Sequence, residues 1–154
     1  MSNFIVSKFG GTSMGNAECM LRSAEVCRNR GSNIVVVSAT SGTTNDLISL
    51  AENAEKGAEV IIKETISKIK QKHSLIADQL KASNEALANL NNLFAEIESI
   101  AQGIFLLRDC STKAKDALQS LGERMSSVLF KEALKEIYLK SAINYNIKLL
   151  DIRD

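Results

Sequence analysis

A lysine, two glycines and two hydroxyl side chains lie together near the start of this chain. The string Val6-Ser7-Lys8-Phe9-Gly10-Gly11-Thr12-Ser13-Met14 follows a short β-strand pattern, Phe4 to Val6. Glycine N–H groups approach phosphate oxygens closely because glycine has no Cβ, and Lys8 offers a mobile positive charge to a phosphoryl group in transfer. Thr12 and Ser13 offer hydroxyl donors and could cap the next helix, whose positive end would face the same place. The pattern predicts a phosphate site, with a tight strand-to-helix turn as the structural alternative.

A second polar cluster, Ser38-Ala39-Thr40-Ser41-Gly42-Thr43-Thr44-Asn45-Asp46, follows the apolar run Ile34–Val37. In parallel α/β sheets ligands bind beside the carboxyl ends of neighbouring strands, so we expect this loop to meet the one that carries Lys8. Its hydroxyl groups could hold a carboxylate or a phosphate through hydrogen bonds. The structural alternative is that they cap the following helix, which would explain some of them but not so dense a cluster.

A third segment, Ser120-Leu121-Gly122-Glu123-Arg124-Met125-Ser126, places a carboxylate directly after a glycine. We expect Glu123 in the first turn of a helix, where the helix dipole stabilises a carboxylate by about 0.3–1 kcal/mol. That structural role alone would explain Glu123. Arg124 is expected to face solvent or to pair with an acid.

Alternating strand and helix patterns are expected to position these segments. A strand over Asn3–Lys8, a helix over Ala17–Arg28 and a strand over Asn33–Ser38 form a strand-helix-strand unit with a right-handed crossover. Asn16 is the expected N-cap of that helix and Gly31 its end. The unbroken β-branched run in the second strand suits burial on both faces of a parallel sheet. A helix over Thr44–Lys56 follows.

Two long apolar stripes then predict an antiparallel helical hairpin. Ser83 is the expected N-cap of its second helix. The stripes consist of Ile62, Ile66, Ile69, His73, Ile76 and Leu80, and of Leu87, Leu90, Phe94, Ile97, Ala101 and Ile104. A lone histidine on such a stripe is interpreted as a half-buried packing residue, because no ligand partner lies at metal-binding spacing.

The last third of the chain predicts one more helical region and a third strand. Ser111 or Thr112 could cap a helix that meets Gly122 and resumes over Glu123–Leu139, and Ile147–Ile152 is the strand candidate.

Composition excludes several classes of protein. The 154 residues suffice for one domain with a core, and the net charge of +1 gives no reason to expect nucleic acid or a membrane as a partner. The apolar runs are too short to span a bilayer. Cys19, Cys27 and Cys110 form no C-x-x-C pair, which favours reduced thiols in a cytoplasmic protein and argues against a zinc site. No metal-ligating residue is predicted.

Taken together, three strings resemble the motifs of the aspartokinases, which belong to the amino acid kinase family. Lys8–Ser13 is similar to the family string K-F-G-G-[TS]-S, Val36–Asn45 to V-V-S-A-x-x-G-x-T-N, and Gly122–Ser126 to G-E-x-x-S. The resemblance covers essentially the whole chain. It implies an α/β fold, the three-layer amino acid kinase architecture around a parallel sheet, of which residues 1–154 would form the N-terminal portion with its long helical hairpin.

The resemblance also implies an activity, transfer of the γ-phosphoryl group of Mg-ATP to the β-carboxylate of L-aspartate, with magnesium held by the nucleotide. This step leads to lysine, threonine and methionine. The implied site residues divide by ligand. Lys8, Gly10, Gly11 and Ser13 would bind the ATP phosphates, with Lys8 as the catalytic residue, while Ser38 and Thr44 would contact aspartate and Glu123 would receive its ammonium group.

We expect residues 1–154 to lack the remainder of the kinase domain and the regulatory ACT domains, through which the intact enzyme would form a homo-oligomer, and to be inactive alone. Two alternatives stay open. One is another amino acid kinase with a different acceptor, such as glutamate or a carbamoyl-type substrate. The other is a non-catalytic protein that binds a partner through the hairpin over Ile62–Ile104.

Overall fold

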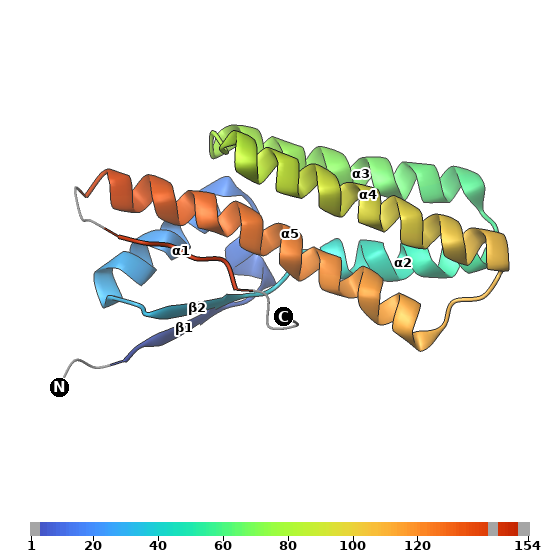
Figure 1. Cartoon of the computed structure of the whole chain (residues 1–154), viewed down its shortest axis with the longest axis horizontal. Coiled ribbons are helices and arrows are strands. Elements are labelled where there is room, and N and C mark those ends of the chain that lie inside the picture. The colour runs from blue at the N-terminus through green and yellow to red at the C-terminus, as the bar shows by residue number, and fades with distance from the viewer. Residues whose placement is uncertain (1–3, 142–144, 151–154) are drawn as a thin grey trace.

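The computed structural model describes residues 4–141 and 145–150, which fold into a small parallel sheet and long helices (Figure 1). Helix α5 lies centrally, with the strands on one side and the α3–α4 pair on the other. None of the helices in the described part is both long and apolar enough to cross a membrane. The elements are β1 (Val6–Phe9), the 3-10 helix η1 (Gly11–Met14), α1 (Ala17–Arg30), β2 (Ile34–Val37), α2 (Thr43–Lys56), α3 (Glu59–Gln79), α4 (Asn84–Leu107) and α5 (Thr112–Leu139).

The β1–α1–β2 unit confirms the predicted order of strand, helix and strand. The strands pair in parallel, with Lys8 opposite Val36. The Asn16 side chain accepts a hydrogen bond from the Cys19 N–H at the start of α1, and Gly31 ends the helix at φ 65, the left-handed conformation that glycine adopts freely. Asn3, the predicted start of the first strand, lies outside the described residues.

The prediction that the second strand is buried on both faces is wrong. Val6, Ile34 and Val36 are 58%, 40% and 47% exposed, and they lie on the same face of the described sheet. The opposite face packs against α5, where the rings of Phe9 and Phe130 lie 5.9 Å apart. The β-branched run therefore forms a strand that is covered on one face in the described structure. The covered face is the one that packs against α5.

The helical hairpin is confirmed. Helices α3 and α4 run antiparallel (Figure 1), and Ser83 caps α4 by accepting a hydrogen bond from the Ala86 N–H. Most of the two predicted stripes is buried, although Ile66 and Leu87 are only half-buried. Both helices also pack against α2, so the stripes belong to a bundle core that α2 and α5 complete.

Helix α5 is continuous, so the predicted interruption at Gly122 is wrong. Ser111 caps α5 by accepting from the Ala114 N–H, and the helix then runs to Leu139 without a break. Gly122 serves close packing instead. A Cβ at this position would lie 3.0 Å from the Cβ of Ala39 and 3.3 Å from Cδ1 of Leu47.

This close contact can be tested by comparing alanine at two helical glycines. Gly103→Ala in α4 is expected to raise the free energy of unfolding by about 0.5–1 kcal/mol, because the new Cβ meets nothing within 4 Å and alanine has the higher helix propensity. Gly122→Ala is expected to lower it by about 1–3 kcal/mol through overpacking against Ala39. Urea unfolding measures both, and equal stabilisation by the two variants would contradict the packing of α5 on the loop after β2.

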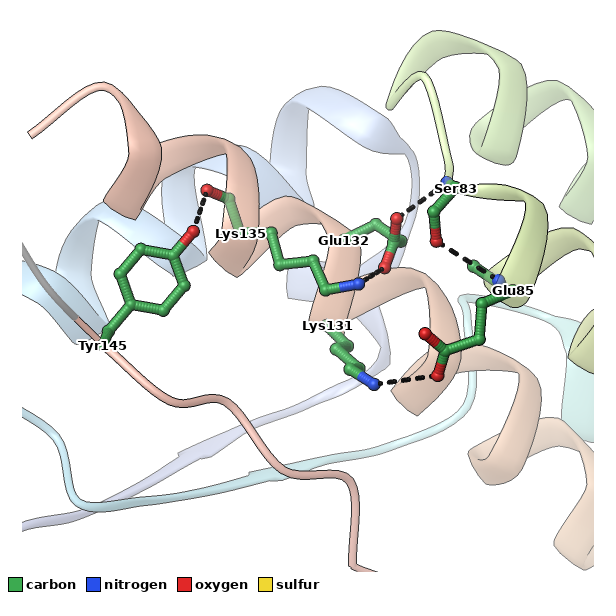
Figure 2. A network of polar contacts seen from close by, with 7 residues as sticks. Ser83, Glu85, Lys131, Glu132, Lys135 and Tyr145 are labelled. Atoms are coloured by element: carbon green, nitrogen blue, oxygen red, sulfur yellow. Dashed lines mark hydrogen bonds and ion pairs between the residues drawn. The ribbon is translucent and has the colours of Figure 1, made fainter. Parts of the chain in front are cut away.

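The predicted third strand is not formed by residues 147–150, and Asp151 and Ile152 lie outside the described residues. Side chains hold the preceding part of this segment against α5. The Tyr145 hydroxyl donates to the Lys135 carbonyl at 3.1 Å (Figure 2), and the Tyr145 ring packs on Tyr138. The described sheet contains only β1 and β2, and Ile147 packs on the core rather than joining a strand ladder.

Figure 2 shows a buried carboxylate, Glu132, that joins α5 to the turn between α3 and α4. Glu132 accepts hydrogen bonds from the Ser83 N–H at 2.8 Å and from Lys135 Nζ at 2.7 Å, and beside it Lys131 pairs with Glu85 at 3.3 Å. Burial on its own raises the pKa of Glu132, but the hydrogen bonds from Lys135 and Ser83 outweigh burial and hold the pKa below its usual value. The ionised carboxylate thus caps the start of α4 from another helix.

Replacing Glu132 by alanine is expected to lower the free energy of unfolding by about 1–3 kcal/mol, because the Ser83 N–H loses its acceptor and Lys135 its partner. Glu59→Ala, which removes an exposed pair with Lys63, is the control and should cost much less than Glu132→Ala. Urea unfolding at neutral pH compares the two. A cost at Glu132 no larger than at Glu59 would show that this capping contact does not stabilise the fold.

Candidate active site

The two polar loops that follow β1 and β2 converge. Lys8 lies at the end of β1, and its Nζ donates to Ser38 Oγ at 3.2 Å. The Ser38 N–H in turn donates to the carbonyl of Phe9 at 3.0 Å, which continues the pairing of the parallel strands. Parallel pairing alone therefore brings the first two predicted segments to one edge of the sheet, as expected from the strand order.

The turn after Lys8 is tightly packed against the second loop. The Ser13 N–H donates to the Gly10 carbonyl at 3.0 Å to close η1. A Cβ on Gly11 would lie 3.2 Å from the Ala39 carbonyl oxygen, so a side chain there would press on the backbone of the second loop. A Cβ on Gly10 would lie 4.0 Å from Lys8 Nζ, an ordinary van der Waals contact, so Gly10 borders the ammonium group.

The cap of α1 is Asn16, so the suggestion that Thr12 or Ser13 caps this helix is wrong. The reason is the 3-10 turn, which places both residues before the start of α1. Ser13 takes part through its carbonyl, which accepts a hydrogen bond from the hydroxyl of Ser23 in α1 at 3.3 Å.

The hydroxyl cluster of the second loop divides into an inner and an outer set. Thr40 and Thr43 are buried, and their hydroxyl oxygens lie 2.5 Å apart. Ser41 is exposed, and Ser38 and Thr44 are half-buried. Helix α2 begins after Gly42 at φ 80 with no side-chain cap, so capping does not explain the hydroxyl groups. The outer set is accessible to a ligand.

His73 of α3 is fully buried beneath this loop rather than half-buried as predicted. Its Nε2 lies 3.1 Å from Thr40 Oγ1, and its Nδ1 lies 2.7 Å from the Ile69 carbonyl oxygen. Burial is the main reason that the pKa of His73 falls to about 4, while the Ile69 hydrogen bond raises the pKa and Lys72 and Asp46 lower and raise it by smaller amounts. The imidazole is therefore neutral near pH 7.

Helix α3 also brings positive charge to the outside of the loop. Lys72 Nζ donates to the Ser41 carbonyl, and Lys68 Nζ pairs with the Asp46 carboxylate at 2.6 Å. Sequence reasoning did not single out either lysine or the contact between His73 and Thr40. The only signal available was the spacing of Lys68 and Lys72, which places them one helical turn apart on α3.

Glu123 is exposed in the middle of α5, so its predicted place in a first helical turn, and the dipole argument that depended on it, are wrong. The misplacement follows from reading Gly122 as a helix boundary. Glu123 directly follows this glycine, where α5 touches Ala39 of the second loop. Arg124 pairs with Glu96 at 2.7 Å, which confirms the expected pairing with an acid.

A family model with the description "amino acid kinase family" matches residues 3–151. The chain belongs to the amino acid kinase family. Two members of this family are similar in sequence. The lysine-sensitive aspartokinase 3 of Escherichia coli K12 is 36% identical over 137 residues, which cover 88% of this chain and 29% of that protein. The chloroplastic aspartokinase 3 of Arabidopsis thaliana is 32% identical over 137 residues, which cover 86% of this chain and 24% of that protein.

The fold prediction is confirmed by likeness to a solved member of the family. The crystal structure of E. coli aspartokinase III in complex with aspartate and ADP matches with a TM-score of 0.78 at 35% identity, over 87% of this chain and 29% of that chain. The chain thus spans less than a third of the length of the relatives that it matches.

Proposed function

We propose that the protein that contains this chain is an aspartate kinase, which transfers the γ-phosphoryl group of ATP to the β-carboxylate of L-aspartate. The observation that carries the proposal is the contact between Lys8 and Ser38. It places a glycine-rich turn suited to phosphates beside a hydroxyl-rich loop suited to a carboxylate. The E. coli relative was solved with aspartate and ADP bound, which supports this pair of ligands.

The donor would bind at the turn after β1. Lys8 would contact the phosphates and stabilise the charge that develops on the phosphoryl group in transfer. Gly10, Gly11 and Ser13 would line the turn, where backbone N–H groups approach the phosphate oxygens. Gly10 borders the Lys8 ammonium group, since a Cβ there would lie 4.0 Å from Nζ, so the turn and the lysine would contact the same phosphate.

The acceptor would bind at the loop after β2. Ser38 and Thr44 would donate hydrogen bonds to aspartate, and the exposed carboxylate of Glu123 would receive its ammonium group. An aspartate β-carboxylate is ionised at pH 7, so it needs no general base. One carboxylate oxygen forms a bond to Pγ while the bond from Pγ to the bridging oxygen breaks, which gives β-aspartyl phosphate and ADP. The rate then depends on alignment and on charge stabilisation.

Further parts of the proposal rest on the motif resemblance and, for the compartment, on the cysteine pattern. Magnesium would reach the site with the nucleotide, the product would lead to lysine, threonine and methionine, and the protein would act in the cytoplasm. The intact enzyme would form a homo-oligomer through regulatory domains.

We also propose that residues 1–154 correspond to the N-terminal part of a kinase catalytic domain and do not turn over alone. The support is the length of the relatives, of which the matched part is 29% or less. The purified chain is expected to release no ADP with ATP and aspartate. Release that Lys8→Ala abolishes would contradict this expectation.

The full-length protein that contains this chain tests the function. ADP release is measured with aspartate, glutamate or acetylglutamate as the acceptor. Release that depends on aspartate would support the proposal, and release with another acceptor would assign a different amino acid kinase activity. No release with any acceptor from a folded protein would favour a non-catalytic protein that binds a partner through α3 and α4.

A further inference from the structure

A continuous buried chain of polar groups links α3 to the loop that follows β2. His73, Thr40 and Thr43 are each no more than 1% exposed. They are joined in sequence by a contact of 3.1 Å from His73 Nε2 to Thr40 Oγ1 and one of 2.5 Å from Thr40 Oγ1 to Thr43 Oγ1. On its far side the imidazole meets the Ile69 carbonyl, through Nδ1 at 2.7 Å. Every polar side-chain atom in this chain of contacts therefore has a partner.

The direction of each hydrogen bond follows from the one group that can only accept. The Ile69 carbonyl requires a proton on Nδ1, so Nε2 of the neutral ring is an acceptor. Thr40 must then donate its hydroxyl proton to Nε2, and Thr43 must donate to the Thr40 oxygen. The position of the proton on the His73 ring thus determines the orientation of both threonine hydroxyl groups.

Both threonines belong to the loop that presents the outer hydroxyl groups. Thr40 lies two residues after Ser38, and Thr43 directly precedes Thr44. The Thr43 N–H also donates to the Thr40 carbonyl at 3.0 Å, so the side-chain and backbone contacts close the same turn. A change in the contact between Thr40 and Thr43 would therefore move the backbone of the loop that carries Ser38 and Thr44.

Burial of an imidazole at this place in the core is energetically unfavourable by itself. Burial of a polar ring costs free energy unless it is fully hydrogen-bonded, and the surrounding stripe is otherwise apolar, with the Phe94 ring edge-on at 6.4 Å. A phenylalanine would fill a similar volume without that cost. Packing alone thus does not account for a histidine here, whereas its hydrogen bond to Thr40 in the loop after β2 does.

We propose that His73 is a positioning residue for the acceptor loop, which it holds through Thr40 and Thr43 in the conformation that presents Ser38 and Thr44 to the substrate carboxylate. The inference rests on the proposed function for the identity of that substrate. The groups that face the imidazole come from α3 (Ile69 and Lys72), from the loop and the start of α2 (Thr40, Thr43 and Asp46) and from α4 (Phe94).

An apolar variant separates positioning from stability. It combines His73→Phe, Thr40→Val and Thr43→Val, so that no buried hydroxyl or imidazole is left without a partner, and the Ile69 carbonyl keeps its bond within α3. Paired apolar replacement of this kind is nearly neutral, and we expect a urea midpoint of unfolding close to that of wild type. His73→Phe alone should be less stable, because Thr40 then loses its acceptor.

Two readouts test the positioning role. Amide hydrogen exchange over residues 38–46, relative to α1, is expected to be at least about tenfold faster in the apolar variant, as for the loss of one hydrogen bond. In the full-length protein the KM for aspartate should rise about tenfold while the KM for ATP stays within about twofold. Ile76→Val, on the same buried face of α3, is the control. It should lower the urea midpoint of unfolding slightly and change neither readout.

The inference would be overturned if residues 38–46 of the folded apolar variant exchanged amide hydrogens at the wild-type rate. An unchanged KM for aspartate in an active apolar variant would also overturn it. Equal changes in both KM values, or the same changes in Ile76→Val, would show a general effect of core substitution and overturn it as well. If the wild-type protein forms no ADP with aspartate, the proposed function fails, and loop exchange alone then decides whether His73 holds the loop.

Discussion

Aspartate-dependent ADP formation by the full-length protein is expected to fall about a hundredfold to a thousandfold when Lys8 is replaced by alanine. Lys8 lies where the glycine-rich turn meets the loop that carries Ser38, with its Nζ 3.2 Å from Ser38 Oγ. Reaction of a carboxylate with a phosphoryl group concentrates negative charge, and a positive group placed beforehand lowers that barrier most. Steady-state kinetics with aspartate as the acceptor measure the effect.

Two matched variants make the Lys8 result specific. Lys140→Ala removes an exposed lysine that pairs with Glu136 at the end of α5, and it should leave turnover unchanged. Lys8→Arg keeps the charge but replaces the compact ammonium group with a planar guanidinium, so it should restore only part of the activity. Because the Lys8 side chain is exposed, all three variants should unfold like wild type. Normal turnover in a folded Lys8→Ala protein would remove Lys8 from the catalytic site.

Acid is expected to destabilise this protein through His73 by about 3 kcal/mol between pH 7 and pH 4. The pKa of His73 falls from 6.5 to about 4 in the folded protein, chiefly because of burial. Between these two values the unfolded chain binds a proton that the folded chain excludes, so acid favours unfolding. The contribution is complete above the unfolded pKa and is lost as the pH falls to the folded pKa. Below that value both states carry the proton and the loss stops.

Urea unfolding of wild type and of the apolar variant, each at several pH values between 7 and 4, isolates the contribution of His73. The two proteins should be similarly stable at pH 7 and should diverge on acidification, with wild type losing more. Glu132 also loses its stabilising effect in acid, since its pKa is held low in the folded state, but it does so in both proteins and cancels in the difference. Parallel pH curves would show that the buried imidazole does not resist protonation.

Local patterns predicted the elements that depend on neighbouring residues. The helix caps at Asn16, Ser83 and Ser111 are interactions within a few residues, and each is found where the sequence places it. The apolar stripes of the hairpin predict which helix faces pack in the core, because residues at helical spacing lie on one face. Convergence of Lys8 and Ser38 could also be predicted, since parallel strand order alone brings the two loops to one edge.

Predictions failed where a residue's role depends on a distant part of the chain. Gly122 reads as a helix boundary from its type, but its function is to let α5 touch Ala39, which lies far away in sequence. The exposure of Val36 likewise depends on which elements cover each face of the sheet. Neither fact can be read from local propensity, because glycine and β-branched residues suit more than one environment.

The sequence by itself determined the chemistry available at this site: a lysine and glycines after one strand, and a cluster of hydroxyl groups after the next. Only the tertiary structure decided which of those hydroxyl groups are accessible and which are buried. It buried Thr40 and Thr43 against His73 and left Ser38 and Thr44 accessible. The physical reason is that a hydroxyl group bonds equally well to a substrate or to a buried imidazole, and its place in the packed structure selects between the two.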